Sequence, residues 1–219
     1  MSNSFEIVGT VSKVDTLFEL LKTPEKLASC DVVELRFDEH MIKEECLKLC
    51  KELRKHTKIL LTIRTDREGG TWTINDEDRF QLFKYFEKDV DMIDIELKSE
   101  LFASNSRSDF SQDIVVVGSF HDYEKTPENE EISDLISQGK DWQIDIVKLA
   151  VFSHSDEDVQ RLATFLNNES ICLIGMGEHG VKTRVGFPTQ GSCLTYGYLD
   201  DSAAPGQLSA QELKELLRA

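Results

Sequence analysis

Hydrophobic positions along this chain follow two alternating periods. Short apolar, β-branched runs predict eight strands, and several of these runs are apolar on both faces, as expected of parallel strands covered by helices. The predicted strands are Glu6–Val11, Val32–Phe37, Ile59–Arg64, Met92–Leu97, Ile114–Phe120, Ile144–Val151, Ile171–Gly175 and Cys193–Leu199.

Amphipathic segments with the period of a helix separate these strands. They predict helices at Val14–Leu21, Ile42–His56, Asp76–Glu87, Glu128–Gly139, Asp156–Leu166 and Ala210–Leu217. Asp76 and Ser155 are the expected N-cap residues of two of them. The segment "SNSRSDFSQ", 104–112, is too short and polar for a full fourth helix. This alternation favours one domain over residues 1–219, an α/β TIM barrel of the (β/α)₈ type, with a doubly wound open sheet as the alternative.

Charge and composition narrow the classes of partner and compartment. The net charge of −16 disfavours nucleic acid and anionic membranes as partners. No apolar run approaches the ~20 residues that span a bilayer, and the N-terminus lacks a signal peptide, so we expect a cytoplasmic protein. The five cysteines predict reduced structural thiols, and Cys46 and Cys50 share a helix face without further ligands, so no metal site is predicted.

Polar residues recur at the carboxyl ends of the predicted strands. In a (β/α)₈ barrel these ends surround the active site. An ion pair within the barrel or a hydrogen-bonded structural histidine would explain single members of the set, but not their recurrence on successive strands. The set comprises Glu34, Arg36, Arg64, Glu68, Asp94, Glu96, Ser119, His121 and Lys148.

Lys148 is the most unusual member, because it interrupts the apolar strand "QIDIVKLAVF". Burial and nearby cations would disfavour its ammonium form and produce a nucleophilic amine that can form a Schiff base with a carbonyl. His121 on the neighbouring strand is suited to move a proton near neutrality. The arginines would hold a carboxylate.

The segment "GMGEHG" matches a dinucleotide-binding fingerprint by its Gly175, Gly177 and Gly180. No clear helix is predicted after Gly180, and too little chain follows for a nucleotide-binding unit, which argues against that function. A phosphate cradle near the seventh and eighth strands remains an alternative.

Seven segments in order along the chain resemble the type I 3-dehydroquinate dehydratases of the shikimate pathway. They are "ELRFD", "TIRTDREGG", "DIEL", "SFHDYEKTP", "DIVKLAV", "GMGEHGVKTR" and "GSCLTYGYLDDSAAPGQL". The resemblance implies a (β/α)₈ barrel without cofactor or metal, a homodimer, and 3-dehydroquinate as the small-molecule substrate.

The same resemblance implies a role for each matching residue. Lys148 resembles the Schiff-base lysine, His121 the acid/base residue and Glu68 the glutamate that orients the histidine. Arg184 resembles the arginine that binds the substrate carboxylate, and Met176 and Phe187 resemble apolar walls. The residues that resemble those recognising ring hydroxyls and carboxylate are Glu34, Arg36, Arg64 and Gln207.

The reaction implied is dehydration to 3-dehydroshikimate. Lys148 would condense with the C3 ketone, His121 would remove a C2 proton, and the C1 hydroxyl would leave as water. One departure concerns Ala203, which stands where relatives often carry a hydroxyl residue, with Ser202 one position early. A class I Schiff-base aldolase and a non-catalytic barrel that binds ligands are the alternatives.

Overall fold

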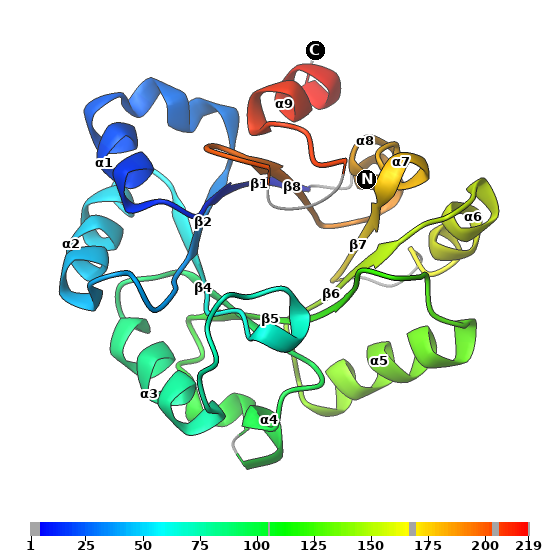
Figure 1. Ribbon diagram of the computed structural model, residues 1–219, viewed down its shortest axis with the longest axis horizontal. Coiled ribbons are helices and arrows are strands. Elements are labelled where there is room, and N and C mark those ends of the chain that lie inside the picture. The colour runs from blue at the N-terminus through cyan, green and yellow to red at the C-terminus, as the bar shows by residue number, and fades with distance from the viewer. Residues whose placement is uncertain (1–4, 105, 167–169, 203–205, 219) are drawn as a thin grey trace.

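Eight parallel strands form the centre of the computed structural model, and helices surround them (Figure 1). The structure describes residues 5–104, 106–166, 170–202 and 206–218. The strands are β1 Glu6–Val11, β2 Val32–Arg36, β3 Lys58–Thr62, β4 Met92–Glu96, β5 Val115–Asp122, β6 Ile146–Phe152, β7 Ile171–Met176 and β8 Leu194–Tyr198.

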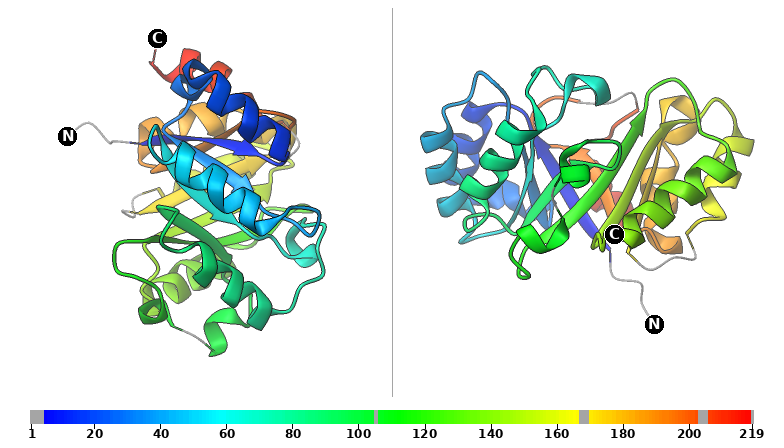
Figure 2. Two further views of the ribbon diagram at one scale, coloured as in Figure 1. Left: turned by 90° about the vertical axis from the view of Figure 1, so that its left-hand side faces the viewer. Right: turned by 90° about the horizontal axis from the view of Figure 1, so that it is seen from below.

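The helices follow the strands in sequence and lie outside them in space, and Figure 2 shows the same arrangement from two other sides. They are α1 Val14–Lys22, α2 Lys43–Leu53, α3 Asp76–Phe86, α4 Leu101–Ser104, α5 Asn129–Asp141, α6 Asp156–Ala163, α7 Gly177–Gly180, α8 Thr183–Gly186 and α9 Ala210–Arg218. Each of these helices is too short or too polar to cross a bilayer.

The strand order is β7-β6-β5-β4-β3-β2-β1-β8, so that β1 pairs in parallel with both β2 and β8. The two end strands, β7 and β8, meet along a seam. There the backbone N–H of Cys193 donates to the carbonyl of Ile171 (2.8 Å), and the N–H of Leu173 donates to Ser192 Oγ (3.2 Å). The predicted (β/α)₈ barrel is therefore confirmed, and the open doubly wound sheet was wrong.

Alternate residues of each strand enter different layers of the core. In β4, Ile93 and Ile95 pack between the strands and the surrounding helices, whereas Met92 belongs to a separate apolar cluster within the barrel. Asp94 and Glu96 share the inward face with Met92 because side chains alternate along a strand. The sequence period thus positions two carboxylates inside a barrel whose outer layer is apolar.

The predicted elements differ from the structure mainly at their ends. The sixth strand begins at Ile146 rather than Ile144, because α5 ends in a turn with Gln143 at φ 58° and the N–H of Ile144 donates to the carbonyl of Gly139 (2.9 Å). Asn75, and not Asp76, caps α3 by accepting a hydrogen bond from the Asp78 N–H, whereas Ser155 caps α6 as predicted.

The fourth helix is the shortened element that the sequence indicates. It consists of the single turn of α4, followed by a 3-10 turn at Arg107–Asp109. Arg107 secures this short connection, because its guanidinium donates to Asp145 and to the carbonyls of Ser111 and Ile114.

Two of the glycines in "GMGEHG" are explained by close packing of the backbone. A Cβ atom on Gly180 would lie 2.3 Å from the carbonyl carbon of Gly175, and Gly177 has a φ of 78°, which favours glycine. Contrary to the prediction, two short helices, α7 and α8, follow β7. They turn the chain back toward the seam of the barrel.

We expect Gly180→Ala to lower the free energy of unfolding by about 1–3 kcal/mol, since the added methyl group meets the Gly175 backbone and no flexible side chain can yield. Urea denaturation measures the change. Gly186→Ala is the matched control, because its Cβ would lie 3.6 Å from the nearest atom, and we expect no loss there. Equal loss in both variants would contradict this account of Gly180.

Candidate active site

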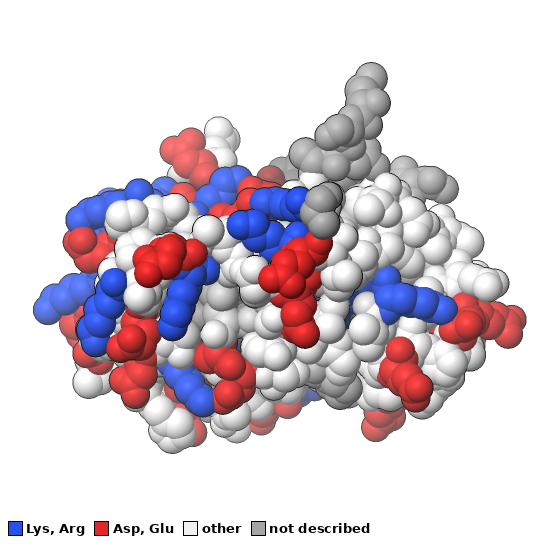
Figure 3. All heavy atoms as spheres, turned by 90° about the horizontal axis from the view of Figure 1, so that it is seen from above, with Lys and Arg blue, Asp and Glu red and all other residues white. Residues whose placement is uncertain are grey.

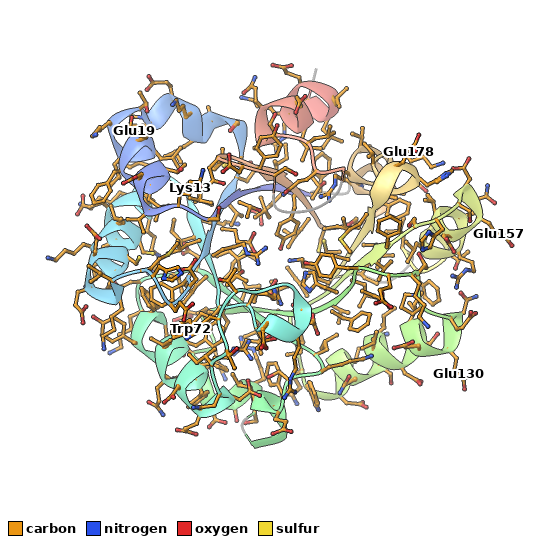
Figure 4. All side chains as sticks on the ribbon, in the orientation of Figure 1. Lys13, Glu19, Trp72, Glu130, Glu157 and Glu178 are labelled. Carbon is orange, nitrogen blue, oxygen red and sulfur yellow. The ribbon has the colours of Figure 1, made fainter. Side chains whose placement is uncertain are left out.

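A cavity inside the barrel collects side chains from or directly after seven of the eight strands. Figure 4 shows side chains converging on the centre of the barrel, whereas the labelled Glu19, Glu130, Glu157 and Glu178 lie on the surrounding helices. The cavity is lined by Thr10, Glu34, Arg36, Arg64, His121, Tyr123, Lys148, Ala150, Ile174, Met176, Arg184, Tyr196 and Gln207. Nearly all of the predicted site residues therefore meet at one place.

Lys148 lies on the inward face of β6 and is only 4% exposed. Its Nζ donates a hydrogen bond to Asp94 Oδ2 at 3.0 Å and lies 4.2 Å from the centroid of the Tyr196 ring. The expected buried lysine is therefore present, but its immediate partners are a carboxylate and an aromatic ring rather than the predicted cations.

Asp94 is completely buried and joins Lys148 to Arg64. Its Oδ1 accepts from Arg64 (2.8 Å) and from the Ser119 hydroxyl (2.5 Å). Burial alone would raise the pKa of Asp94, but the charges of Arg64 and Lys148 outweigh burial and hold that pKa well below its usual range. Asp94 is therefore a carboxylate in the folded protein.

The guanidinium of Arg64 is largely occupied by protein partners. It donates to Asp94 and Ser119 and pairs with Glu96 at 3.1 Å, while Glu96 also pairs with the fully buried Arg79. These contacts form a chain of alternating charges from Lys148 to Arg79. Arg64 reaches the cavity as predicted, but its main observed contacts orient Asp94.

His121 at the end of β5 contacts the predicted Glu68. Both its backbone N–H and its ring Nδ1 lie 2.9 Å from Glu68 Oε2. Burial raises the pKa of Glu68 to about 7, although Arg64 acts in the opposite direction. Burial, Arg64 and Lys148 hold the pKa of His121 well below its ordinary 6.5, so the imidazole is neutral near pH 7.

A second cavity, of about 600 Å³, adjoins this pair. Glu68 and His121 both line it, together with residues of the loops that follow β3 and β4. His121 is therefore shared by two cavities, and only the inner one contains Lys148.

Glu34 and Arg36 enter the site from β2 without forming an ion pair with each other in the described structure. Glu34 accepts hydrogen bonds from the hydroxyls of Thr10 (2.8 Å) and Thr62 (2.7 Å). Arg36 donates to the carbonyl of Gly69 at 3.2 Å. Two hydroxyls therefore position Glu34, and a backbone carbonyl positions Arg36.

Arg184 in α8 projects into the cavity and is 3% exposed. One terminal nitrogen donates to the carbonyl of Tyr196 (3.0 Å), while its Nε has no hydrogen-bond partner among the described residues. Burial lowers the pKa of Arg184 to about 10, so the side chain remains cationic at neutral pH. A buried cation with an unused donor is suited to bind a carboxylate.

Met176 and Gln207 line the cavity, but Phe187 does not. Phe187 is 3% exposed and belongs to the apolar cluster between the strands and helices that includes Leu149 and Leu173. Phe187 is therefore not one of the residues that meet in the cavity, contrary to the role that the sequence resemblance implied. Ala203 lies outside the described residues.

Three residues of the site received no role from the sequence. Asp94 and Ser119 were recognised only as polar residues at strand ends, and Tyr196 was not singled out. The spacing of Asp94 and Glu96 identified a shared face, but only the pairing of β4, β5 and β6 brings Asp94 to Lys148.

Basic side chains outnumber acidic ones in the lining of the cavity, although the chain carries a net charge of −16. Its lining includes Arg36, Arg64, Lys148 and Arg184, with Glu34 as the acidic member. By contrast, basic and acidic side chains are interspersed on the surface seen in Figure 3. The local arginine cluster that an anionic substrate requires is therefore present. The described residues contain no group of three or more His, Cys, Asp or Glu side chains placed to hold a metal ion.

The buried amine of Lys148, the neutral imidazole of His121 and the cation of Arg184 provide the groups for imine formation, proton transfer and carboxylate binding. Comparison with known proteins supports a specific family. Residues 11–219 match the family model described as type I 3-dehydroquinase.

Named relatives and solved structures agree with this match. The chain is 38% identical over 202 residues to a 3-dehydroquinate dehydratase of Methanococcus maripaludis, covering 88% of this chain and 89% of the relative. Its fold is similar to the 3-dehydroquinate dehydratase of Geobacillus kaustophilus, with a TM-score of 0.83, 28% identity, and coverage of 98% and 90% of the two chains.

A third similar protein is a type I 3-dehydroquinate dehydratase of Clostridium difficile, solved with covalently modified comenic acid. The TM-score is 0.79 at 26% identity, with 99% and 92% of the two chains covered. On the family match, the sequence identity and the barrel geometry together, this chain belongs to the type I 3-dehydroquinase family.

Proposed function

We propose that this protein dehydrates 3-dehydroquinate to 3-dehydroshikimate through a Schiff base on Lys148. The observation that carries the proposal is the buried Lys148 amine, which lines the same cavity as His121 and Arg184. The names of the similar proteins support the substrate.

In the proposed reaction, Lys148 loses a proton and its nitrogen attacks the C3 carbonyl. The carbonyl oxygen takes up the two protons that the nitrogen loses in all and leaves as water, which gives a protonated imine. The imine draws electrons from C2, so that a C2 proton can be removed to give an enamine. Departure of the C1 hydroxyl as water then forms the C1–C2 double bond, and hydrolysis releases the product and the lysine.

His121 is proposed to take the C2 proton and to return it to the departing hydroxyl. A neutral imidazole is the required form of the base, and the lowered pKa of His121 supplies that form. Glu68, 2.9 Å from Nδ1, is proposed to orient the ring so that the other nitrogen, Nε2, faces the substrate.

Arg184 is proposed to bind the substrate carboxylate. The residues proposed to recognise the ring hydroxyls and the remaining surface of the substrate are Glu34, Arg36, Arg64, Gln207 and Met176, all of which line the cavity. The homodimer expected from the family resemblance is part of the same proposal, and light scattering would give the molar mass that tests it.

We expect borohydride, added together with 3-dehydroquinate, to attach the substrate carbon skeleton to Lys148, because hydride reduces the imine to a stable secondary amine. Intact-protein mass and peptide mapping measure the label. Lys148→Ala should abolish both the label and turnover.

Two observations during the same incubation distinguish the dehydratase from a class I aldolase and from a non-catalytic barrel that binds ligands. Dehydration generates an enone that absorbs in the ultraviolet, whereas aldol cleavage does not. A folded wild-type protein that binds 3-dehydroquinate but gives neither enone nor label would instead be a binding module, and the proposal would be wrong.

We expect His121→Ala to lower kcat by about 10²–10⁴, the usual contribution of general acid–base catalysis. Steady-state measurement of enone formation gives kcat. A kcat within twofold of wild type would contradict the role of His121.

Glu68→Gln should change stability in a pH-dependent manner. The pKa of Glu68 is raised from 4.5 to about 7 in the folded protein, so between these pH values the folded state keeps a proton that the unfolded state has lost. The free energy of unfolding of the wild type therefore falls as the pH rises from 4.5 to about 7. Glutamine does not titrate, so the variant does not lose stability in this way. Its free energy of unfolding relative to wild type should rise by roughly 1–3 kcal/mol as the pH increases from 4.5 to about 7. Urea denaturation at several pH values tests this, with the exposed Glu130→Gln as control. A difference independent of pH would refute it.

Arg184→Ala should raise KM for 3-dehydroquinate by at least about tenfold, because a charge-assisted hydrogen bond to the carboxylate is lost. The exposed Arg67→Ala, in the loop after β3, is the control for removal of a cation. An unchanged KM in Arg184→Ala would assign carboxylate binding to another residue.

A further inference from the structure

Two groups flank the Lys148 nitrogen and have no assigned part in the reaction. The Asp94 carboxylate lies 3.0 Å from Nζ, and the Tyr196 ring lies 4.2 Å away by its centroid. Asp94 is 0% exposed and Tyr196 is 4% exposed, so water screens neither interaction. Both groups favour a positive charge on the nitrogen between them.

Asp94 is held firmly for such a role. Arg64 and Ser119 both donate to Oδ1, which leaves Oδ2 directed at Lys148. Arg64 is itself held by Glu96 at 3.1 Å. The carboxylate therefore cannot turn away from the lysine without breaking several buried hydrogen bonds.

The nitrogen carries the same charge before and after condensation. An ammonium and a ketone become a protonated imine and water, with one positive charge on each side. An imine nitrogen is a weaker base than an amine, so a buried imine without a counter-charge would tend to lose its proton. The neutral imine is a poor electron sink, and C2 would then be less acidic.

We propose that Asp94 is a catalytic residue that keeps the Lys148 imine protonated, with the Tyr196 ring covering the same cation from a second side. This inference rests on the proposed Schiff base at Lys148. The carboxylate pairs with the ammonium in the free protein and with the protonated imine once the substrate is bound. Asp94 thereby maintains the electron sink through the step in which C2 is deprotonated.

The Tyr196 side chain is a neutral phenol next to the Lys148 nitrogen. Its hydroxyl has no hydrogen-bond partner among the described residues, and burial raises its pKa well above 10, so the phenol stays neutral. A neutral aromatic face can attract the cation without forming an ion pair of its own.

Other charged or titratable groups surround this cation, and they must be distinguished from Asp94. In the described structure only Asp94 accepts a hydrogen bond from Nζ. Besides Tyr196, the remaining groups that line the cavity or interact electrostatically with Lys148 or Asp94 are Glu34, Arg36, Arg64, Glu68, His121, Tyr123, Cys172 and Arg184.

The test is reductive trapping with 3-dehydroquinate and cyanoborohydride, which reduces protonated imines much faster than neutral ones. The label on Lys148 is measured by intact mass across the neutral pH range. In Asp94→Asn, we expect the upper pH limit of labelling to fall by about one to three units, the usual effect of an opposite charge at this distance. Labelling should recover as the pH is lowered.

Glu96→Gln is the matched control. It also removes a buried carboxylate from β4 and a partner of Arg64, but Glu96 makes no contact with Lys148 in the described structure. Since Glu96 reaches Lys148 only through Arg64 and Asp94, we expect this variant to lower the pH limit by less than Asp94→Asn does. An Asp94→Asn profile that coincides with wild type, or a Glu96→Gln profile shifted equally, would overturn the proposal.

If Asp94→Asn fails to fold, a second pair of variants tests whether the groups around the Lys148 nitrogen stabilise the protonated imine. Tyr196→Phe keeps the ring and Tyr196→Leu removes it, so the leucine variant should be labelled about 5- to 30-fold more slowly than the phenylalanine variant. Equal labelling would overturn the role of the ring and, with Asp94→Asn unfolded, the proposal. Absence of label from wild-type Lys148 would instead refute the Schiff base itself, so the two failures are distinguishable.

Discussion

The site depends on the buried contact between Lys148 and Asp94. A lysine buried away from water is costly unless its charge is paired, and Asp94 in turn requires Arg64 to be stable as a carboxylate. The alternation continues through Glu96 to Arg79. One charged side chain on β6 therefore needs matching charges on β4, on α3 and in the loop that follows β3.

The barrel makes this network possible because it separates an apolar outer layer from a polar interior. Residues such as Ile93 and Ile95 stabilise the packing of strands against helices, while Asp94 between them faces inward. Only the face of each strand that packs against the helices has to be apolar. The other face is free to carry charge, provided that neighbouring strands supply the partners.

Electrostatics also separates the two halves of the site. Around Lys148 the carboxylate and the aromatic ring favour a cation, whereas His121 is neutral under the influence of burial, Arg64 and Lys148. A nitrogen whose positive charge is stabilised next to a neutral base suits chemistry in which one nitrogen withdraws electrons and the other accepts a proton. Burial raises the pKa of Glu68 to about 7, and this shift links the same arrangement to pH-dependent stability.

The sequence by itself determined the alternation of elements, and through it the barrel and most of the residues that meet in its cavity. Hydrophobic period is a local property, and one polar residue in an apolar strand, such as Lys148, is visible without a structure. The ends of strands were predicted less accurately, as at Ile146, because a left-handed turn at Gln143 leaves little trace in the hydrophobic pattern.

Only the tertiary structure decided which groups touch. Asp94 and Tyr196 are distant from Lys148 in the chain, and parallel pairing, together with closure of the barrel, brings them to its nitrogen. Phe187 shows the converse, because a residue of suitable type near the motif packs outside the barrel. Residue type and spacing fix which face of an element a side chain occupies, whereas its partners across strands depend on register and closure, which are properties of the whole sheet.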